Sequence, residues 1–296
     1  AKPGSAPLEN KSAAAPGWVS VFHQRVSQDE KGAGIDLALQ SKVNRAAATK
    51  FFTNVGLEGD TEYQPPLRRP GACMQSPRPR SSRLRRVLRA AGLAVACPVL
   101  LVLLNEYAFT SGTRARGGEL KAIPVPAYAT ARGGERDVKI MAYNIAKAFV
   151  NEDMPRFTER STVVARLDRI ADVIRAESPD LVFLSEVVWE TPYNSVNQVR
   201  HLASACGFRY YAFGENSNVG LPFFRYVGGN AILSRWPLYN GDNPDLPGRQ
   251  PFWVTRNNRR VLMADADIDG ARVRCIAAHF DSFQLDNNLR QVRRIL

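Results

Sequence analysis

Four apolar runs of strand length in the second half of the chain each lead to a polar side chain, and this pattern most constrains the fold. Strands that end in this way deliver their last side chains to one rim of a sheet, where a ligand can meet them. An amide, a carboxylate, a guanidinium and an imidazole gathered there suit a divalent cation that holds a phosphate ester. The four residues are Asn144, Glu186, Arg235 and His279, from the segments 138–144, 180–186, 229–235 and 277–281.

The sequence between and after these runs predicts helices and a hairpin. Apolar residues recur at intervals of three and four over 163–174 and again over 196–206, which is the spacing of a helix that packs one face. Two later strands, 261–268 and 272–279, are joined through Asp269-Gly270, a two-residue hairpin signal. Strand–helix–strand units followed by a hairpin predict a mixed α/β sheet.

Taken together, in this order and at this spacing, the four segments resemble the endonuclease/exonuclease/phosphatase superfamily, which includes pancreatic-type deoxyribonucleases, abasic-site endonucleases, neutral sphingomyelinases and inositol-phosphate phosphatases. The resemblance covers about residues 137–296. It implies a two-sheet α/β sandwich of the deoxyribonuclease-I-like type, with helices outside. It also implies Mg²⁺-dependent hydrolysis of a phosphodiester or phosphomonoester, with Mn²⁺ as an alternative cation. Nucleic acid, a phospholipid head group and a sugar phosphate all remain open as substrates.

The resemblance assigns roles to individual residues. Glu186 corresponds to the principal metal ligand, and Asn144 to the residue that positions the phosphate and the water shell of the metal. His279 corresponds to the imidazole that contacts the scissile phosphate and stabilises its growing negative charge. Lys147 follows Asn144 closely in the sequence and carries a positive charge. We therefore expect Asn144 and His279 to be catalytic, and Glu186 with Asn144 to hold the metal.

Three further residues are candidates for substrate binding: Asn230, Arg235 and Asp281. Arg235 has a second interpretation, in which it pairs with a carboxylate and locks the sheet instead of touching substrate. Asp281 has two interpretations of equal weight, because it can orient the imidazole of His279 or cap the helix that follows.

Two later motifs of the superfamily, a Gly-Asp-X-Asn strand end and a closing Asp-His pair, do not occur in the sequence. Leu285, Leu289, Val292 and Leu296 lie at helical spacing and predict an amphipathic helix at the end of the chain. No capping glycine or proline follows them. These features predict a catalytic domain that is incomplete at its C-terminus and inactive alone. The alternative is a non-catalytic membrane-tethered fragment or pseudogene product.

Residues 74–110 predict an arginine-rich segment and a signal anchor. Six arginines and no acidic residue lie between positions 74 and 89, and the following residues 90–105 carry no charge. These 16 residues are fewer than the ~20 that a spanning helix needs, but arginine stems can snorkel. The rule of positive charge inside then places the C-terminal domain outside the cytoplasm, with residues 90–109 in the membrane. A cleaved signal peptide, giving a secreted protein, and a buried helix are the alternatives, and no protein partner is evident.

The net charge of +12 does not by itself indicate nucleic-acid binding, because six of the excess cations belong to this arginine tract. Residues 137–296 carry 20 Lys and Arg against 18 Asp and Glu, a net of +2. Residues 111–136 are rich in Gly, Pro and Arg and predict a linker. Residues 1–73 predict a mostly disordered extension or a fusion remnant, in which 21–58 faintly resemble part of a DDE-type insertion-sequence transposase without a catalytic carboxylate.

Overall fold

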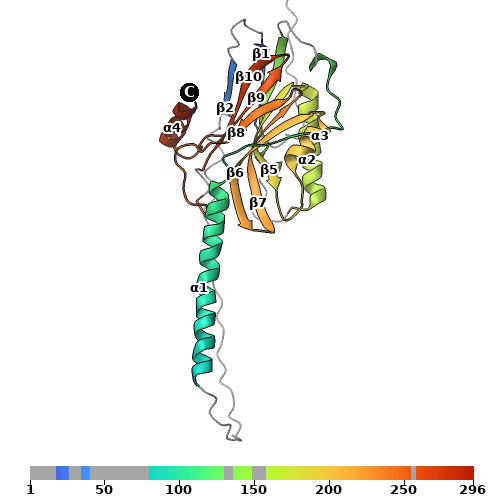
Figure 1. Ribbon diagram of the computed structural model, residues 1–296. Coiled ribbons are helices and arrows are strands. Elements are labelled where there is room, and N and C mark those ends of the chain that lie inside the picture. Colours follow the sequence, from blue (N-terminus) through green and yellow to red (C-terminus); the bar gives the residue numbers. More distant parts are fainter. Residues whose placement is uncertain (1–17, 27–34, 41–79, 130–135, 149–157, 255–257) are drawn as a thin grey trace, which may run out of the picture. The chain divides into compact units, whose positions relative to one another are not determined.

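The computed structural model describes residues 18–26, 35–40, 80–129, 136–148, 158–254 and 258–296. Residues 42–102 form one compact unit, and residues 1–41 with 103–296 form the other. The described part of the first unit, 80–102, is helical and belongs to α1 (Arg80–Thr110), whose last residues belong to the second unit. The second unit contains all the strands (Figure 1).

Two sheets form the framework of the second unit. The first has the order β1-β4-β5-β7-β6-β3, in which β4 and β5 are parallel and every other pair is antiparallel. The second has the order β2-β10-β9-β8, in which only β2 and β10 are parallel. Their bounds are β1 (Trp18–Val26), β2 (Ile35–Gln40), β3 (Arg116–Glu119), β4 (Arg136–Asn144), β5 (Leu181–Glu190), β6 (Tyr210–Leu221), β7 (Phe224–Ser234), β8 (Leu238–Asp242), β9 (Val261–Ile268) and β10 (Ala271–Ala278).

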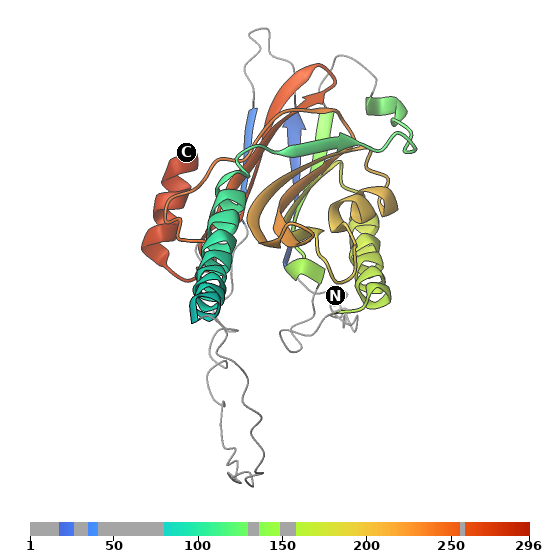
Figure 2. The same cartoon turned by 60° about the horizontal axis from the view of Figure 1, so that its bottom comes forward.

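The sheets pack face to face over a core of aliphatic and aromatic side chains, among them Ile140, Phe183 and Ile232 of the first sheet, Val273 of the second, and Trp236 between β7 and β8. Helices α2 (Arg160–Glu177) and α3 (Gln198–Ala205) cover the other face of the first sheet (Figure 2). The predicted two-sheet α/β sandwich is confirmed by this arrangement.

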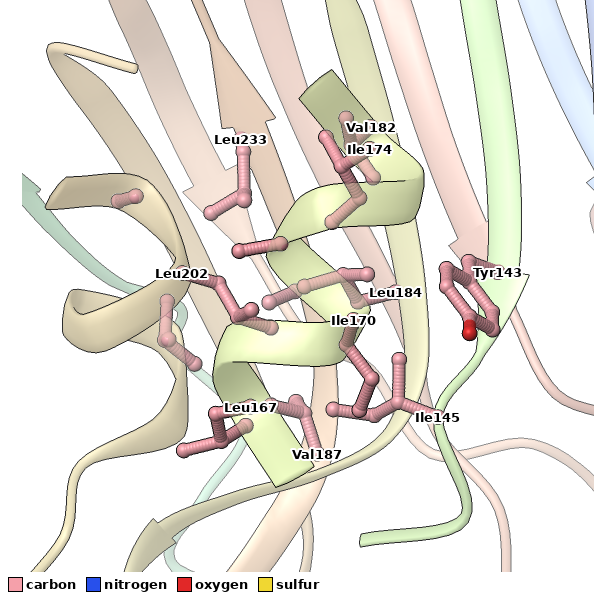
Figure 3. Close-up of a cluster of buried hydrophobic side chains, with 14 of the residues drawn as sticks. Tyr143, Ile145, Leu167, Ile170, Ile174, Val182, Leu184, Val187, Leu202 and Leu233 are labelled. Carbon is pink, nitrogen blue, oxygen red and sulfur yellow. The ribbon is translucent and has the colours of Figure 1, made fainter. Parts of the chain in front are cut away.

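Helix α2 forms because its apolar residues lie on one stripe, and that stripe packs on β5. Leu167, Ile170 and Ile174 are buried against Val182 and Leu184 (Figure 3). The helix ends at Ser178, whose φ of 47° is left-handed and whose N–H bonds to the carbonyl groups of the last turn. Pro179 follows and cannot continue the helix.

The predicted hairpin between the last two strands is also present. Asp269 and Gly270 join β9 to β10, with φ values of 54° and 90°. Two successive residues with positive φ are the requirement of the turn that matches the twist of a two-residue hairpin. An Asp-Gly pair supplies this conformation at little cost, because glycine has no Cβ and aspartate tolerates the left-handed region.

Two predictions about the connecting segments were wrong in part. Within the expected extension 1–73, β1 pairs with the edge of the first sheet and β2 with the edge of the second. Within the expected linker 111–136, β3 pairs with β6. Composition missed these strands because an edge strand gains its place from ladder hydrogen bonds, which any sequence without proline can make. The transposase resemblance of 21–58 lies mostly outside the described residues.

The predicted terminal helix is α4 (Leu285–Ile295), but it does not bury the face expected. Asn287 and Gln291 are its buried residues, whereas Leu285, Leu289 and the following Leu296 are exposed. Two hydrogen bonds hold the polar face of α4 in place. Asn287 Nδ2 donates to Asp281 Oδ2 at 2.9 Å, and Gln291 Nε2 donates to the Pro247 carbonyl at 2.9 Å. Specific hydrogen bonds, and not the apolar stripe, therefore set the rotation of α4.

Helix α1 is longer than the uncharged run suggested. Its segment Leu84–Thr110 has 27 residues, and an 18-residue stretch within it has a mean hydropathy of 2.4, so the helix is long and apolar enough to cross a membrane. Pro98 lies inside it without ending it. The side chains of residues 84–102 are exposed.

Candidate active site

Asn144, Glu186 and His279 come from three strands and meet at one carboxylate. The parallel pairing of β4 with β5 sets Asn144 opposite Ser185, so Glu186 is the next residue along. Asn144 Nδ2 donates to Glu186 Oε1 at 3.1 Å, and His279 Nε2 lies 3.4 Å from the same oxygen. His279 directly follows β10, so the site joins the two sheets at one rim. The predicted convergence of these three residues is present.

Glu186 occupies an irregularity in its strand. The pairing of β5 with β7 shifts register between Leu184 and Val187, and the φ of Glu186 is 53°. A bulge of this kind inserts an extra residue and re-aims its side chain. A left-handed conformation in a residue with a long side chain is strained, and such strain concentrates at functional sites. The bulge turns the carboxylate toward Asn144 and His279.

The turn after β4 brings a lysine to the same carboxylate. Lys147 Nζ lies 3.3 Å from Glu186 Oε2, and Lys147 and both of its neighbours have positive φ, with values of 46°, 59° and 56° over 146–148. The buried Gln198 fixes this turn, because its Nε2 donates to the Lys147 carbonyl at 2.7 Å and its Oε1 accepts from Val188 N at 2.9 Å. Gln198 therefore ties the lysine turn to the strand just beyond the bulge.

The charges around Glu186 keep it ionised. Burial alone would raise the pKa of Glu186, but Lys147, His279 and the Asn144 amide outweigh burial and lower it below its usual value. The opposite holds for His279, where burial and the nearby Arg259 lower the pKa to about 4, although Glu186 opposes them. His279 is therefore neutral near pH 7 and can donate a single imidazole N–H.

Two residues that the sequence analysis did not select also lie at this site. The Arg259 side chain is partly buried, and its buried Nε has no hydrogen-bond partner within the described residues. It interacts electrostatically with Glu186 and Asp281. The Tyr226 hydroxyl is also buried without such a partner, and burial followed by Glu186 raises its pKa. An unpartnered buried guanidinium nitrogen is costly and indicates a place for an anion. No motif marked Arg259, which precedes β9 in a run of two arginines.

Residues 141–279 match the model of the Endonuclease/Exonuclease/phosphatase family. The match covers slightly less than half of the chain, and it supports the resemblance that the four motifs carry. No curated protein matches the chain.

Solved structures of the endonuclease/exonuclease/phosphatase fold are similar over about half of the chain. A protein of this name from Beutenbergia cavernae DSM 12333 is 25% identical with a TM-score of 0.41, and 54% of this chain aligns with 43% of that one. A family protein from Leptotrichia buccalis C-1013-b is 14% identical with a TM-score of 0.37, over 52% and 62% of the two chains. A humanized D. rerio TDP2 is 19% identical with a TM-score of 0.34, over 53% of each. The chain thus spans about half the length of these structures.

Within the matched region, Asn230 lies beside the site but is buried between the sheets. Asn230 is fully buried on β7, at the place where β7 lies opposite the bulge of β5. Its Nδ2 donates to the carbonyl groups of Arg260 at 3.4 Å and Ala277 at 3.5 Å, and its Oδ1 has no partner within the described residues. Asn230 therefore links the two sheets behind the carboxylate.

Arg235 lies at the opposite end of the strands from the site. Its Nε donates to the Pro179 carbonyl at 3.3 Å and lies 3.5 Å from Asp180 Oδ1. Because Leu181 pairs with Ser234, Glu186 is five residues farther along β5, or about 17 Å at the rise of a strand. The geometry favours the interpretation that Arg235 locks the sheet.

Asp281 makes the contacts of a helix-start residue. Its Oδ1 accepts from Phe283 N at 2.8 Å and Gln284 N at 3.2 Å, and its Oδ2 accepts from Asn287. Of the two interpretations left open for Asp281, these bonds favour the organisation of the turn into α4. Its charge remains close enough to act on Arg259.

Proposed function

We propose that this protein is a Mg²⁺-dependent phosphoesterase that hydrolyses phosphodiesters or phosphomonoesters. The observation that carries the proposal is the meeting of an amide, an imidazole and a lysine at the single carboxylate of Glu186, all within 3.4 Å. The family match over residues 141–279 supports the same class of reaction. Nucleic acid, phospholipid head groups and sugar phosphates share the phosphate ester that such a site would bind.

Glu186 and Asn144 are the residues that would hold the cation. One ionised carboxylate and one amide oxygen fit Mg²⁺, which takes one or two carboxylates and keeps several waters, and Mn²⁺ accepts the same oxygen donors. Among the described residues, no cluster of three or more His, Cys, Asp and Glu side chains could form a closed metal site. When bound, the cation would neutralise charge on the phosphate and polarise its oxygen atoms.

Three donors of the chain surround the place where a phosphate would lie. Lys147 and Arg259 supply positive charge. The neutral His279 supplies one hydrogen bond without adding a positive charge. Donors fixed in advance stabilise developing negative charge more than solvent does. The residues assigned here bind and orient the ester. The base that activates water is not among them, because the Gly-Asp-X-Asn and Asp-His segments are absent from the sequence.

Replacing Arg259 by leucine tests the phosphate-binding role. We expect Arg259→Leu to weaken Mg²⁺-dependent binding of inorganic phosphate at least about tenfold, because a charged hydrogen bond contributes about 1.5–3 kcal/mol. Binding is measured by calorimetry on the full chain with Mg²⁺ and again with EDTA. Arg272→Leu, at an exposed position of β10, is the matched control and should bind as the parent protein does.

The same measurements separate the two functional hypotheses. Phosphate binding that requires Mg²⁺, together with hydrolysis of a 4-nitrophenyl phosphate ester, supports the enzyme. Mg²⁺ and phosphate binding without any hydrolysis supports the alternative of a non-catalytic membrane-tethered protein. Absence of Mg²⁺-dependent phosphate binding would refute the assignment of the site.

We further propose that α1 anchors the protein in a membrane with the C-terminal domain outside the cytoplasm. The arginines of α1 lie before position 90, and none follows until Arg114. Positive charge on the N-terminal flank retains that side in the cytoplasm. A reporter that is active only outside the cytoplasm, fused after Gly112, should therefore be active. A cytoplasm-only reporter that works at this junction would reject the orientation, and release of the domain into the medium would support the secreted alternative.

A further inference from the structure

Large apolar side chains project from two short loops of the second unit. Phe223, at the tip of the β6–β7 hairpin, is 99% exposed, and Trp253 is 61% exposed. We call these side chains and their exposed neighbours the apolar rim. It consists of Leu221, Phe223, Phe224, Trp253 and Val254.

The hairpin tip is held in a fixed conformation by Arg225. Its Nη1 donates to the Gly220 carbonyl at 2.9 Å, and its Nε donates to Asn218 Oδ1 at 2.6 Å. Gly220 has a φ of 135° and lies so close to the Phe224 carbonyl that a Cβ would be 2.1 Å from its oxygen. Tyr193 packs edge-on against Phe224, with ring centroids 5.1 Å apart. The exposure of Phe223 is therefore a property of an ordered turn.

Both loops of the rim are bonded to the last turns of α1, which belong to the same unit. Asn105 Oδ1 accepts from Gly220 N at 2.7 Å, and Glu106 Oε1 accepts from Phe252 N at 2.9 Å. These last turns also carry exposed apolar side chains, with Leu103 at 61% and Tyr107 at 73% exposure. The rim is therefore bonded to the part of α1 at which the apolar segment ends in sequence.

The charge of the two loops suits a membrane surface. Residues 219–225 and 246–254 contain no acidic residue, and each segment contains one arginine. Aromatic side chains favour the boundary between lipid head groups and acyl chains, and cations favour the anionic surface of a bilayer. Exposed apolar side chains on loops that are bonded to an apolar helix indicate lipid as the partner, because the same bilayer would cover both.

We propose that the apolar rim inserts into the interface of the membrane that α1 enters, and so holds the domain against that membrane. The inference rests on the proposed anchoring by α1. The candidate active site lies toward the same end of the sheet, because Gly229 pairs beside Glu186 and Phe223 is six residues away, or about 20 Å along the strand. The rim would thus keep the end of the sheet that carries the site on the side that faces the membrane.

The test measures contact between lipid and single positions of the full chain. Cys73 and Cys97 are replaced by serine, a cysteine is placed at position 223, and a fluorophore on it is examined in vesicles of phosphatidylcholine and phosphatidylglycerol. Brominated acyl chains quench only fluorophores that reach them. We expect a loss of fluorescence at 223 comparable with that at position 100 in α1. Position 239, which is 52% exposed on β8, is the matched control and should not be quenched.

Each outcome tests the apolar rim, and the fluorophore at position 100 distinguishes a failure of the rim from a failure of the anchor. Quenching at 100 but not at 223 would overturn the rim while leaving the anchor in place. Absence of quenching at both positions would reject the anchor and the rim together. A fluorophore at 223 that is shielded from water but not quenched by lipid would show that protein, such as a second copy of the chain, covers the rim. Phe223→Asp should abolish quenching of a fluorophore at 253 without changing that at 100.

Discussion

Replacing Glu186 by glutamine is expected to lower the affinity of the protein for Mg²⁺ at least about a hundredfold, because changes around metal ligands already cost about ten- to a hundredfold. Glutamine preserves the shape of the side chain at the bulge but removes the charge that Lys147 and Asn144 stabilise. Any Mg²⁺-dependent hydrolysis of a phosphate ester by the protein should fall with the affinity. Removal of Mg²⁺ by EDTA should have the same effect on the parent protein.

Thermal unfolding provides a readout of this substitution that does not require turnover. Mg²⁺ should raise the midpoint of the parent protein, since a ligand at a hundred times its dissociation constant stabilises by about 2.7 kcal/mol. The shift should disappear in Glu186→Gln. It should persist in Glu190→Gln, an exposed carboxylate at the end of the same strand. An unchanged Mg²⁺ shift in Glu186→Gln would show that the cation binds elsewhere.

Replacing Arg260 by leucine is expected to destabilise the protein by about 3–5 kcal/mol, the usual cost of breaking a buried ion pair. Arg260 is 1% exposed and joins segments that are distant in sequence. Its Nη2 donates to the Phe109 carbonyl at 2.6 Å, and its Nε lies 2.7 Å from Asp245 Oδ1. Its Nη1 donates to the carbonyl of the buried Glu215 at 3.2 Å. Leucine would leave the Glu215 carboxylate with Arg116 and the Asn218 amide as its partners.

Urea unfolding of the detergent-solubilised full chain measures this loss. Arg294→Leu, at an exposed position of α4, is the control and should change the free energy of unfolding by no more than about 0.5 kcal/mol. If Arg260 and Glu215 act as a pair, replacing both by leucine should cost less than the sum of the single changes. A strictly additive double variant would show that Arg260 stabilises the fold through Phe109 and Asp245 instead.

The sequence identified the site residues that lie at the ends of strands. It missed the site residues that lie before a strand or in a helix. Asn144, Glu186 and His279 each follow an apolar run, so their meeting at one rim could be expected from strand direction. Arg259 precedes a strand, and Gln198 begins a short helix, so no periodic signal marks either of them. Arg235 carries the same pattern as Glu186 but lies at the other end of the sheet, because β7 runs antiparallel to β5. Strand direction cannot be read from one run alone.

The apolar periodicity and the turn residues by themselves determined the α/β class, the helix faces, the hairpin at Asp269 and the long apolar helix α1. These features are local, because each depends on burial or φ preference within a few residues. Tertiary structure alone decided the bulge that aims Glu186, the pairing of β1 and β2 at the sheet edges, and the rotation of α4 onto Asn287 and Gln291. These depend on hydrogen bonds and charges contributed by distant segments, whose partners exist only once the chain has folded.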